Sequence, residues 1–427
     1  MRVKRYSTDI VIAGGGLAGV ISAISAAEED VQVLLIEKNS FLGGTSTAAM
    51  VGEMNATSKD GKNYVSKTGQ NIISHLMKEN AGLLFVNEPM SSNPHIKVDR
   101  IRYNGEYLKI ILDRMAKERS IQVLFKSSID HIKSINQNNI KAIVSTNYEK
   151  IYISSKILID ATGNAECVYL LKGKTIVNKK SMNQPASLIF RVGGVDISKF
   201  RIIHIDEIKK IIAKGYEKGI LPGKILALAE IPGTGEVTIN ATRSTNLDHE
   251  SIEDISRALI ETREQIYYIM DFLKKNMQGF KYAYLSAIGT DIGIRDRRRI
   301  TGVYELTGED IIKGKKFSDA IAVGTYPVDI HKNKDGAIEF TEIENEGVYT
   351  IPYRSLITGE FDNVIVSGKC ISADNVSFGS IRVIGTIMNI AEAAGAAANL
   401  AVKQNKSFHE IEVSQLQNIL RSKGMKI

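Results

Sequence analysis

Cysteine is scarce in this sequence: its 427 residues include two, Cys167 and Cys370, and tryptophan is absent. The two cysteines stand far apart and no C-x-x-C pair occurs. We therefore expect no iron–sulfur cluster, no dithiol redox centre and no metal site supplied by this chain. So few cysteines also fit a reducing compartment.

Long apolar runs are absent as well. No window reaches the ~18 uncharged apolar residues that a membrane-spanning helix needs. The basic start, Met1-Arg2-Val3-Lys4-Arg5, resembles the first part of a secretory signal, but the apolar run Ile10–Ala13 behind it is too short. The sequence therefore predicts a cytoplasmic protein with no membrane partner.

Charge is only mildly unbalanced, since 55 Lys and Arg face 48 Asp and Glu, for a net charge of +7. The basic residues are dispersed, apart from one dense cluster at Arg295–Arg299. That cluster has no aromatic residues interleaved, which argues against a surface for nucleic acid.

A chain of this length exceeds what one hydrophobic core usually supports, so two domains are expected. Residues 1–172 and 349–427 are predicted to form one discontinuous α/β domain, and residues 173–348 an inserted α+β domain. In the first domain, hydrophobic periodicity predicts strands over 9–13, 31–36, 121–125, 129–135, 140–145, 151–153, 156–160 and 363–367, and helices over 20–29, 63–80, 105–119 and 381–403. In the second, it predicts strands over 184–192, 236–242, 282–289 and 320–327, and a helix over 251–276.

The run Gly14-x-Gly16-x-x-Gly19 lies between a predicted strand and a predicted helix. Gly14 permits a tight turn, Gly16 lets the backbone approach a pyrophosphate, and Gly19 lets helix and strand pack closely. The helix N-terminus would then face the phosphates. Glu37 ends the second strand about twenty residues on, where an acid accepts hydrogen bonds from ribose hydroxyls. This pattern predicts a dinucleotide site.

NAD and FAD share this first unit, and two features favour FAD. The pair Gly43-Gly44 follows Glu37 almost at once, which lets the backbone pass close to a cofactor. The run Asp160-Ala-Thr-Gly163 ends a strand far downstream.

Together these runs resemble the FAD-dependent oxidoreductases of the glutathione-reductase-like superfamily, and more distantly the fumarate reductase flavoproteins. The resemblance extends to the tail and the inserted region, through Gly293-Ile-Arg295, Tyr326-Pro-Val-Asp-Ile-His331, Ile351-Pro-Tyr-Arg354, Val366-Ser-Gly-Lys-Cys-Ile-Ser372 and Gly379-Ser-Ile-Arg382. It spans nearly the whole chain and is weakest at about 193–285. These motifs are specific for fold and cofactor and say little about the substrate.

The resemblance implies a Rossmann-like, three-layer FAD-binding domain with an inserted α+β substrate or cap domain. The residues expected to hold FAD are Gly14, Gly16, Leu17, Ala18, Gly19, Glu37, Lys38, Gly43, Gly44, Thr45, Ser46, Ala161, Gly163, Gly368, Lys369, Ser380 and Ile381.

The chain also departs from this family. Asp374-Asn375 stand where a Thr-His pair is common, so no role for that histidine carries over. Gly385 replaces a common proline, and Asn164 replaces an acid. Fumarate-reductase-like enzymes can link FAD covalently through a histidine beside the glycine pair that corresponds to Gly43-Gly44. This chain has Thr45-Ser46-Thr47 there, so we expect FAD to be bound without a covalent link.

Three residues are candidates for catalysis. His331 lies in a family-like motif, and an imidazole with a near-neutral pKa suits proton transfer; the alternative is a structural histidine. Arg354 is expected to hold a substrate carboxylate or the charge of reduced flavin, or else to form a salt bridge between domains. Arg295 is the best candidate in its cluster for binding an anion. Cys370 lacks a resolving partner and is expected to be a packing residue.

The function predicted is an FAD-dependent oxidoreductase, a dehydrogenase or reductase that acts on an unidentified small molecule by hydride transfer. A separate electron donor or acceptor is its expected partner, and the oligomeric state is open. The alternatives are a tRNA-modifying flavoprotein, supported only by the net charge, and a non-enzymatic FAD-binding electron-transfer protein. An inserted domain of this size argues against the latter.

Overall fold

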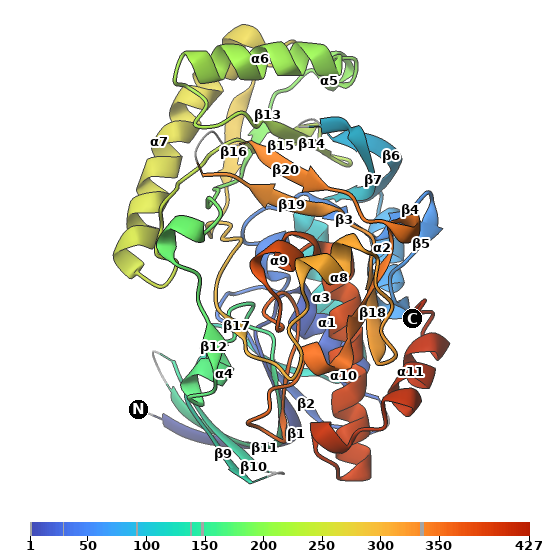
Figure 1. The fold of residues 1–427 in the computed structure, drawn as a ribbon. Coiled ribbons are helices and arrows are strands. Elements are labelled where there is room, and N and C mark those ends of the chain that lie inside the picture. Colours follow the sequence, from blue (N-terminus) through green and yellow to red (C-terminus); the bar gives the residue numbers. More distant parts are fainter. Residues whose placement is uncertain (1, 29, 91–92, 137–138, 147–148, 334–336) are drawn as a thin grey trace.

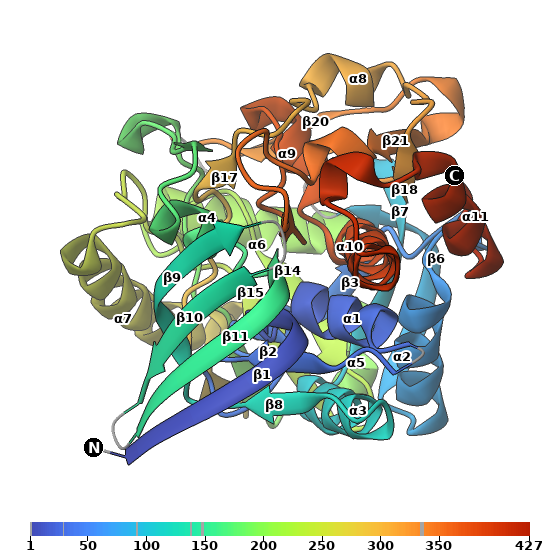
Figure 2. The same ribbon diagram turned by 90° about the horizontal axis from the view of Figure 1, so that it is seen from below.

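A seven-stranded sheet forms the centre of the fold, and it positions the glycine motif at the carboxyl end of its first strand (Figures 1 and 2). The computed structural model describes residues 2–28, 30–90, 93–136, 139–146, 149–333 and 337–427. Strands β8, β2, β1, β11 and β22 run parallel, and β10 and β9 continue the sheet antiparallel from β11. Their bounds are β1 Arg2–Ala13, β2 Val33–Ile36, β8 Gln122–Leu124, β9 Ser128–Asn136, β10 Asn139–Ser145, β11 Glu149–Asp160 and β22 Val364–Val366.

Helices pack on the parallel strands, and the closest pair is formed by α1 and α10. The helices of this region are α1 Leu17–Ala26, α2 Lys67–Lys78, α3 Gly105–Glu118, α4 Glu166–Leu170, α10 Ile384–Gln404 and α11 Val413–Ser422. The Ser22 hydroxyl donates to Ala391 O at 2.9 Å. A Cβ on Gly395 would lie 2.4 Å from Ser22 O, so only glycine permits this approach. The Ala- and Gly-rich helix α10 thus packs closely against α1, and it also contacts β11 and β22 of the sheet.

A second hydrophobic core is built by residues between Ala186 and Ile294. Its four-stranded antiparallel sheet, in the order β14-β15-β13-β16, lies beside the helices α5, α6 and α7 at the top of Figure 1. The elements are β13 Phe190–Gly193, β14 Ala227–Ile231, β15 Glu236–Asn240, β16 Tyr284–Ile288, α5 Ile197–Arg201, α6 Ile205–Glu217 and α7 Ile252–Asn276. Phe190, Phe272 and Phe280 are buried in this core.

The packing bears on the division into domains. Ile300, Leu306, Ile321 and Val328 belong to the core of the main sheet, although the sequence-based division put them in the inserted domain. The division into a cofactor domain and a cap domain remains a proposal. We propose that the cap is centred on residues 186–294, a shorter segment than the predicted 173–348.

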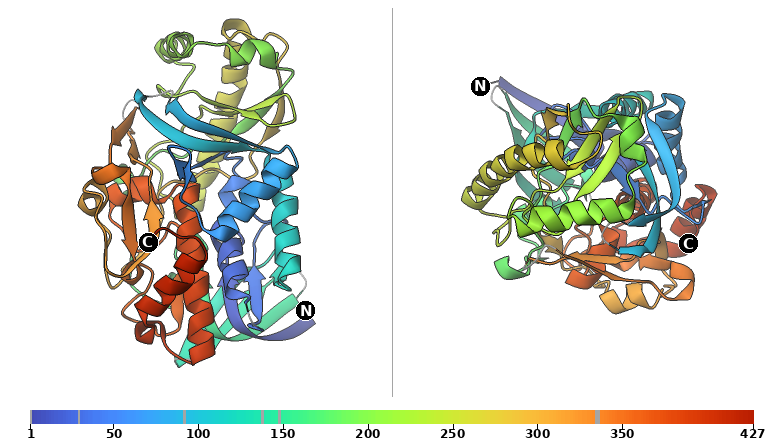
Figure 3. Two further views of the ribbon diagram at one scale, coloured as in Figure 1. Left: turned by 90° about the vertical axis from the view of Figure 1, so that its right-hand side faces the viewer. Right: turned by 90° about the horizontal axis from the view of Figure 1, so that it is seen from above.

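The remaining strands are short or form hairpins. They are β3 Glu53–Asn55, β4 Ser58–Lys59, β5 Lys62–Asn63, β6 Gly82–Met90, β7 Asn93–Tyr103, β12 Thr175–Ile176, β17 Arg299–Ile300, β18 Ala320–Gly324, β19 Val328–His331, β20 Ile338–Thr341 and β21 Tyr349–Pro352. Two further helices are α8 Gly308–Ile312 and α9 Asn375–Ile381. Strand β7 contacts β3, β6 and β14, so the β6–β7 hairpin joins the two cores, as Figure 3 shows.

Several boundaries differ from those predicted. Strand β1 begins at Arg2 because residues 2–8 pair with the first half of β11, and that strand is continuous where two were predicted. Helix α1 begins at Leu17, directly after the glycine turn, and Glu29, the last residue of the predicted helix, lies outside the described residues. The predicted helix over 381–403 corresponds closely to α10, and the short helix α9 before it, which meets α10 at an angle of 93°, was not predicted.

In the part of the chain that the structure describes, no single helix has the length and apolarity to span a membrane; the bent α9–α10 pair passes that test only when taken together, and α10 is largely buried in the core.

Candidate active site

The glycine turn between β1 and α1 is shaped by contacts that side chains would block. Gly14 has φ +99°, and a Cβ there would lie 2.5 Å from Ala161 O. A Cβ on Gly19 would lie 1.8 Å from Gly14 O, so that helix and strand could not pack as they do. Gly16 differs, because a Cβ there would meet only Gly44 Cα, at 3.8 Å. The protein itself therefore leaves open space in front of Gly16.

Helix α1 begins at this open space without a side-chain cap. Gly16 is its N-cap residue, and among the residues that the structure describes no side chain caps it. A bare helix N-terminus offers free N–H donors and the positive end of the helix dipole to an anion. This arrangement fits a pyrophosphate.

Glu37 is buried at the carboxyl end of β2, next to the glycine turn. Its Oε2 accepts from Gly15 N at 2.6 Å and its Oε1 from Asn39 N at 2.7 Å. Each carboxylate oxygen has a second lone pair, so hydrogen bonds from ribose hydroxyls remain possible. The carboxylate is thus fixed in orientation before any ligand arrives.

Three segments far apart in sequence converge on the start of α1. Gly43 N donates to Gly15 O at 2.9 Å, and Gly44 approaches Gly16 so closely that a Cβ on Gly44 would lie 2.9 Å from Gly16 Cα. A Cβ on Gly368, which has φ +90°, would lie 2.9 Å from the Ala18 side chain. The glycines predicted to hold the cofactor therefore form one cradle of bare backbone, and its chemistry fits FAD.

The other predicted cofactor residues differ in their surroundings. Leu17, Ser46, Ala161 and Ile381 are buried, whereas Thr45 is exposed. Gly163 has φ +72° beside the Lys369 side chain. Lys38 is exposed and lies 3.7 Å from Asp291.

Lys369 and Ser380 are engaged within the protein. The Lys369 ammonium donates to Ile294 O at 2.8 Å and to Arg295 O at 3.0 Å. Burial, together with the charge of Arg297, lowers its pKa to about 8. The Ser380 hydroxyl donates to Tyr326 O at 2.6 Å, so it anchors α9 to the segment that leads into β19.

A second cluster of polar groups surrounds His331 at the end of β19. Its Nε2 lies 3.2 Å from Asp329 Oδ1, and its Nδ1 lies 3.3 Å from Arg243 Nη2. A guanidinium can only donate, so Nδ1 is the acceptor and the proton of the neutral ring is on Nε2, facing Asp329. Burial and the nearby Arg295 lower the pKa of His331 to about 3. The premise that His331 has a near-neutral pKa is therefore wrong.

Two arginines complete this cluster. Arg382 Nη2 donates to both Asp329 O and Oδ1, each at 3.1 Å. Arg295 donates to neutral acceptors, the Pro185 carbonyl and the Ser187 hydroxyl. Burial, Arg382 and Arg243 lower the pKa of Arg295 to about 9. Burial alone would raise the pKa of Asp329, but His331 and Arg382 hold it below its ordinary value. Three arginines thus share this cluster with two carboxylates, Asp329 and Asp296, whose effect on the pKa of Arg295 is smaller than that of burial, Arg382 and Arg243.

Gln184 links this cluster to the loop that carries Arg295. Its Oε1 accepts from His331 N at 3.0 Å, while its Nε2 donates to Asp296 Oδ1 at 2.9 Å. Gln184, Arg243, Asp329 and Arg382 were not predicted as site residues. Asp329 and Arg382 stand inside quoted family-like motifs, which was a usable signal, whereas Gln184 and Arg243 have no such context.

Arg354 is not brought together with His331 and Arg295. Its guanidinium donates to Asp319 through Nε at 2.9 Å and Nη2 at 3.2 Å, and it lies 5.0 Å from the Tyr304 ring. Its side chain is 45% exposed. These contacts match the salt-bridge alternative.

The cysteines and metal-binding residue types add no reactive centre. Cys167 and Cys370 are buried, and burial raises the pKa of the Cys370 thiol to about 12. Within the described ranges, no group of three or more His, Cys, Asp or Glu has a geometry that would hold a metal ion.

Comparison with known proteins shows what this chain is similar to. Digoxin reductase of Eggerthella lenta is 32% identical over 83 residues, which are 18% of this chain and 15% of that protein. The match thus spans well under two thirds of that relative. The crystal structure of p-nitrophenol 4-monooxygenase from Pseudomonas putida has 9% identity and a TM-score of 0.53, covering 98% of this chain and 84% of that chain.

A geranylgeranyl bacteriochlorophyll reductase-like protein from Thermoplasma acidophilum has 13% identity and a TM-score of 0.51, with the same coverage of 98% and 84%. At such identities the likeness shows the fold alone, and it confirms the α/β, Rossmann-like class. The predictions of FAD as cofactor and of an enzyme are confirmed by a family match that covers residues 9–420. The chain belongs to the family of FAD dependent oxidoreductases.

Proposed function

We propose that this enzyme oxidises or reduces a small molecule that carries an anionic group, by hydride transfer to or from FAD bound without a covalent link. FAD supplies the two-electron chemistry when bound, and the protein positions the substrate and tunes the charge around it. The proposal includes a cytoplasmic location and a separate electron donor or acceptor.

The residues proposed to hold FAD are those of the glycine cradle. The start of α1 at Gly16 would bind the pyrophosphate, and Glu37 would accept from the ribose. Gly43, Gly44 and Gly368 would let backbone pass along the cofactor. The hydroxyl side chains of Thr45 and Ser46 do not form the stable bond to flavin that a histidine can, which supports non-covalent binding.

The proposed substrate class rests on the surroundings of the Arg295 guanidinium. Among the described residues this guanidinium donates only to neutral acceptors. The nearby carboxylates Asp329 and Asp296 raise its pKa, but burial, Arg382 and Arg243 lower it by more. A guanidinium in a protein interior is costly unless an anion compensates its charge. Arg295 also remains partly accessible, as a ligand-binding group must. A carboxylate on the substrate would supply the missing negative charge, and an arginine fork binds a carboxylate in a fixed orientation.

His331 is proposed as a positioning residue instead of a proton carrier. With its proton on Nε2 it holds Asp329, and through Nδ1 it contacts Arg243. The imidazole thus fixes the carboxylate around which the arginines are arranged.

Binding of simple acids to the oxidised holoenzyme tests the proposal without knowledge of the true substrate. Acetate, succinate and benzoate are titrated beside their neutral amides while the flavin absorption spectrum is followed. We expect at least one acid to perturb the spectrum saturably and its amide not to do so. Arg295→Gln and Arg382→Gln should each weaken that acid at least about tenfold, the worth of a charge-assisted hydrogen bond.

The proposal is overturned if no acid perturbs the flavin, if the amides act equally, or if both variants bind like the wild type. The tRNA-modifying and electron-transfer alternatives are not proposed, because no contact among the described residues favours either.

A further inference from the structure

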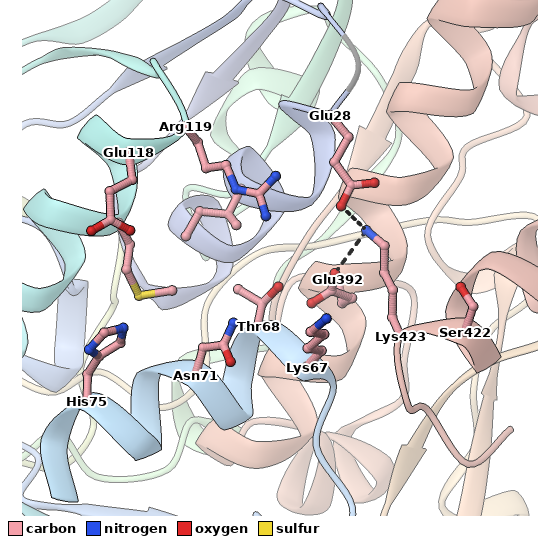
Figure 4. Close-up of a pocket in the computed structure, with 12 residues that line it drawn as sticks. Glu28, Lys67, Thr68, Asn71, His75, Glu118, Arg119, Glu392, Ser422 and Lys423 are labelled. Carbon is pink, nitrogen blue, oxygen red and sulfur yellow. Dashed lines mark ion pairs between the residues drawn. The ribbon is translucent and has the colours of Figure 1, made fainter. Parts of the chain in front are cut away.

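A cavity of about 370 Å³ lies at the opposite end of α1 from the glycine cradle (Figure 4). Its walls come from the C-terminal ends of α1 and α3, from α2, from α10 and from the end of α11. Helix α1 has ten residues, which span about 15 Å at the rise of an α-helix. The cavity is therefore distinct from the pyrophosphate cradle, and its size is within the range of small-molecule pockets.

One wall of the cavity consists of charged side chains that form ion pairs with one another. The Lys423 ammonium lies 3.0 Å from Glu28 Oε1, 3.2 Å from Glu392 Oε1 and 3.0 Å from Ser25 Oγ. Glu392 is 1% exposed and also accepts from the Ser66 hydroxyl at 2.8 Å. Figure 4 shows Glu28 and Glu392 on either side of Lys423. These groups form a preformed wall with little capacity left for a ligand.

The other polar groups of the cavity lie toward its open side, where Lys67 and Arg119 are exposed to solvent. In the described part of the chain, Lys67 and Arg119 form no ion pair, and both line the cavity. Thr68 as a residue is 7% exposed; its hydroxyl oxygen keeps some solvent access and has no hydrogen-bond partner among the described residues. Lys67 and Thr68 stand in the first turn of α2, a twelve-residue helix whose N-terminus favours negative charge.

The balance of free charge decides the kind of ligand. Lys67 and Arg119 are two uncommitted cations, and Glu118 is the uncommitted carboxylate on the lining. In Figure 4, Arg119 extends from α3 toward the side of the cavity where Thr68 and Asn71 rise from α2. Over the whole lining, the cations Lys67, Arg119 and Lys423 equal the carboxylates Glu28, Glu118 and Glu392 in number. Donors from two helices converge on the side away from Glu28, where they can bind the oxygens of an anion.

We propose that this cavity is a second binding site, for a small anionic metabolite whose carboxylate or phosphate group is held by Lys67, Thr68 and Arg119. The site is independent of the proposed redox reaction, because none of these residues belongs to the cofactor cradle or to the cluster around His331.

Isothermal titration calorimetry of the FAD-loaded protein tests this site, with citrate as the carboxylate probe and inorganic phosphate as the phosphate probe, at constant ionic strength. Saturable binding of one probe, weakened at least tenfold by Arg119→Gln, Lys67→Gln and Thr68→Val, supports the proposal and identifies which anionic group the site prefers. Arg114→Gln is the matched control: it lies on the same helix, its side chain is 67% exposed, and it is outside the cavity.

FAD content and melting temperature are measured for every variant, so that loss of binding is not confused with loss of fold. Because citrate also carries carboxylates that suit the proposed substrate site, Arg295→Gln is titrated in parallel. Citrate binding that is lost in Arg295→Gln but kept in Arg119→Gln overturns the second site while supporting the proposed function. Binding of neither probe, or equal binding in all three cavity variants, also overturns it.

Discussion

His331 Nε2 lies 3.2 Å from Asp329 Oδ1, and both side chains are more than nine-tenths buried. Since burial and Arg295 lower the pKa of His331 to about 3, the pair at neutral pH consists of a neutral imidazole and a carboxylate. In mild acid the His331 imidazole of the unfolded chain binds a proton, whereas that of the folded chain stays neutral. The pair therefore links stability to pH.

Stability should fall as the pH drops below 6.5, the ordinary pKa that His331 regains on unfolding. Between that value and about 3 the unfolded state binds the extra proton, so this residue removes ~1.4 kcal/mol of unfolding free energy per pH unit. Urea unfolding at pH 7 and pH 5 should show a loss about 2 kcal/mol larger in the wild type than in His331→Gln. His95→Gln, at an exposed position of β7, serves as control and should behave like the wild type. Equal pH dependence in His331→Gln and the wild type would contradict the assignment.

Removing the carboxylate at the centre of the cluster should cost far more than removing one near the surface. Asp329→Asn leaves Arg382 without its charged partner in the interior, so we expect a loss of about 3–5 kcal/mol of unfolding free energy. Asp319→Asn breaks the pair with Arg354, whose side chain is 45% exposed and keeps its contact with water, so the expected loss is about 1 kcal/mol or less. Denaturant unfolding measures both. Similar losses in the two variants would show that the cluster is not held by Asp329.

Much of the cofactor cradle was predictable because it is local. Gly14, Gly16 and Gly19 lie within six residues of one another between a strand and a helix, so spacing alone indicates their roles. The cluster around His331 was less predictable, because its members come from separate segments that only the folded chain brings together. Arg243 follows β15 and Arg382 follows α9, and nothing in their sequence spacing relates them.

The fold shows the same contrast. The long helix α7 was predicted closely, since its apolar residues recur at helical spacing. The β6–β7 hairpin was not predicted, because Leu83, Leu84 and Val86 on β6 are exposed and give no alternating pattern. The short helix α9 was not predicted, because its seven residues, which include Ser377, Gly379 and Ser380, are too few for a helical pattern to show.

Two glycine substitutions separate cofactor binding from folding. In Gly16→Val the new side chain enters the space that the protein leaves open, so FAD binding should be abolished while the melting temperature of the apoprotein is little changed. In Gly19→Val the side chain would collide with Gly14 O, so folding itself should fail. Flavin content and thermal unfolding are measured on both. Stoichiometric FAD in Gly16→Val would remove that residue from the cofactor site.

The mode of FAD attachment is tested by acid precipitation of the holoenzyme. Thr45, Ser46 and Thr47 follow Gly43-Gly44, so no histidine stands there to form a covalent link. We therefore expect all flavin in the supernatant, where chromatography identifies it as FAD. Flavin that stays with the precipitated protein would mean that another side chain forms a covalent link.

Arg354 provides a matched comparison with the arginines of the cluster. Because its guanidinium is paired with Asp319, Arg354→Gln should leave both FAD content and the spectral response to bound acids unchanged. Arg382→Gln should weaken that response at least about tenfold. If Arg354→Gln abolishes the response instead, the residue reaches the substrate and its salt bridge is secondary.

The rate of anaerobic flavin reduction tests the central claim most directly. The holoenzyme is mixed with a library of small organic acids, each beside its neutral amide or ester, and bleaching of the flavin is followed. We predict that at least one acid reduces the flavin, that its neutral counterpart does so at least about tenfold more slowly, and that Arg295→Gln removes this preference. Reduction by neutral donors alone, or equal rates for acid and amide in the wild type, would contradict an active site built to bind an anionic substrate.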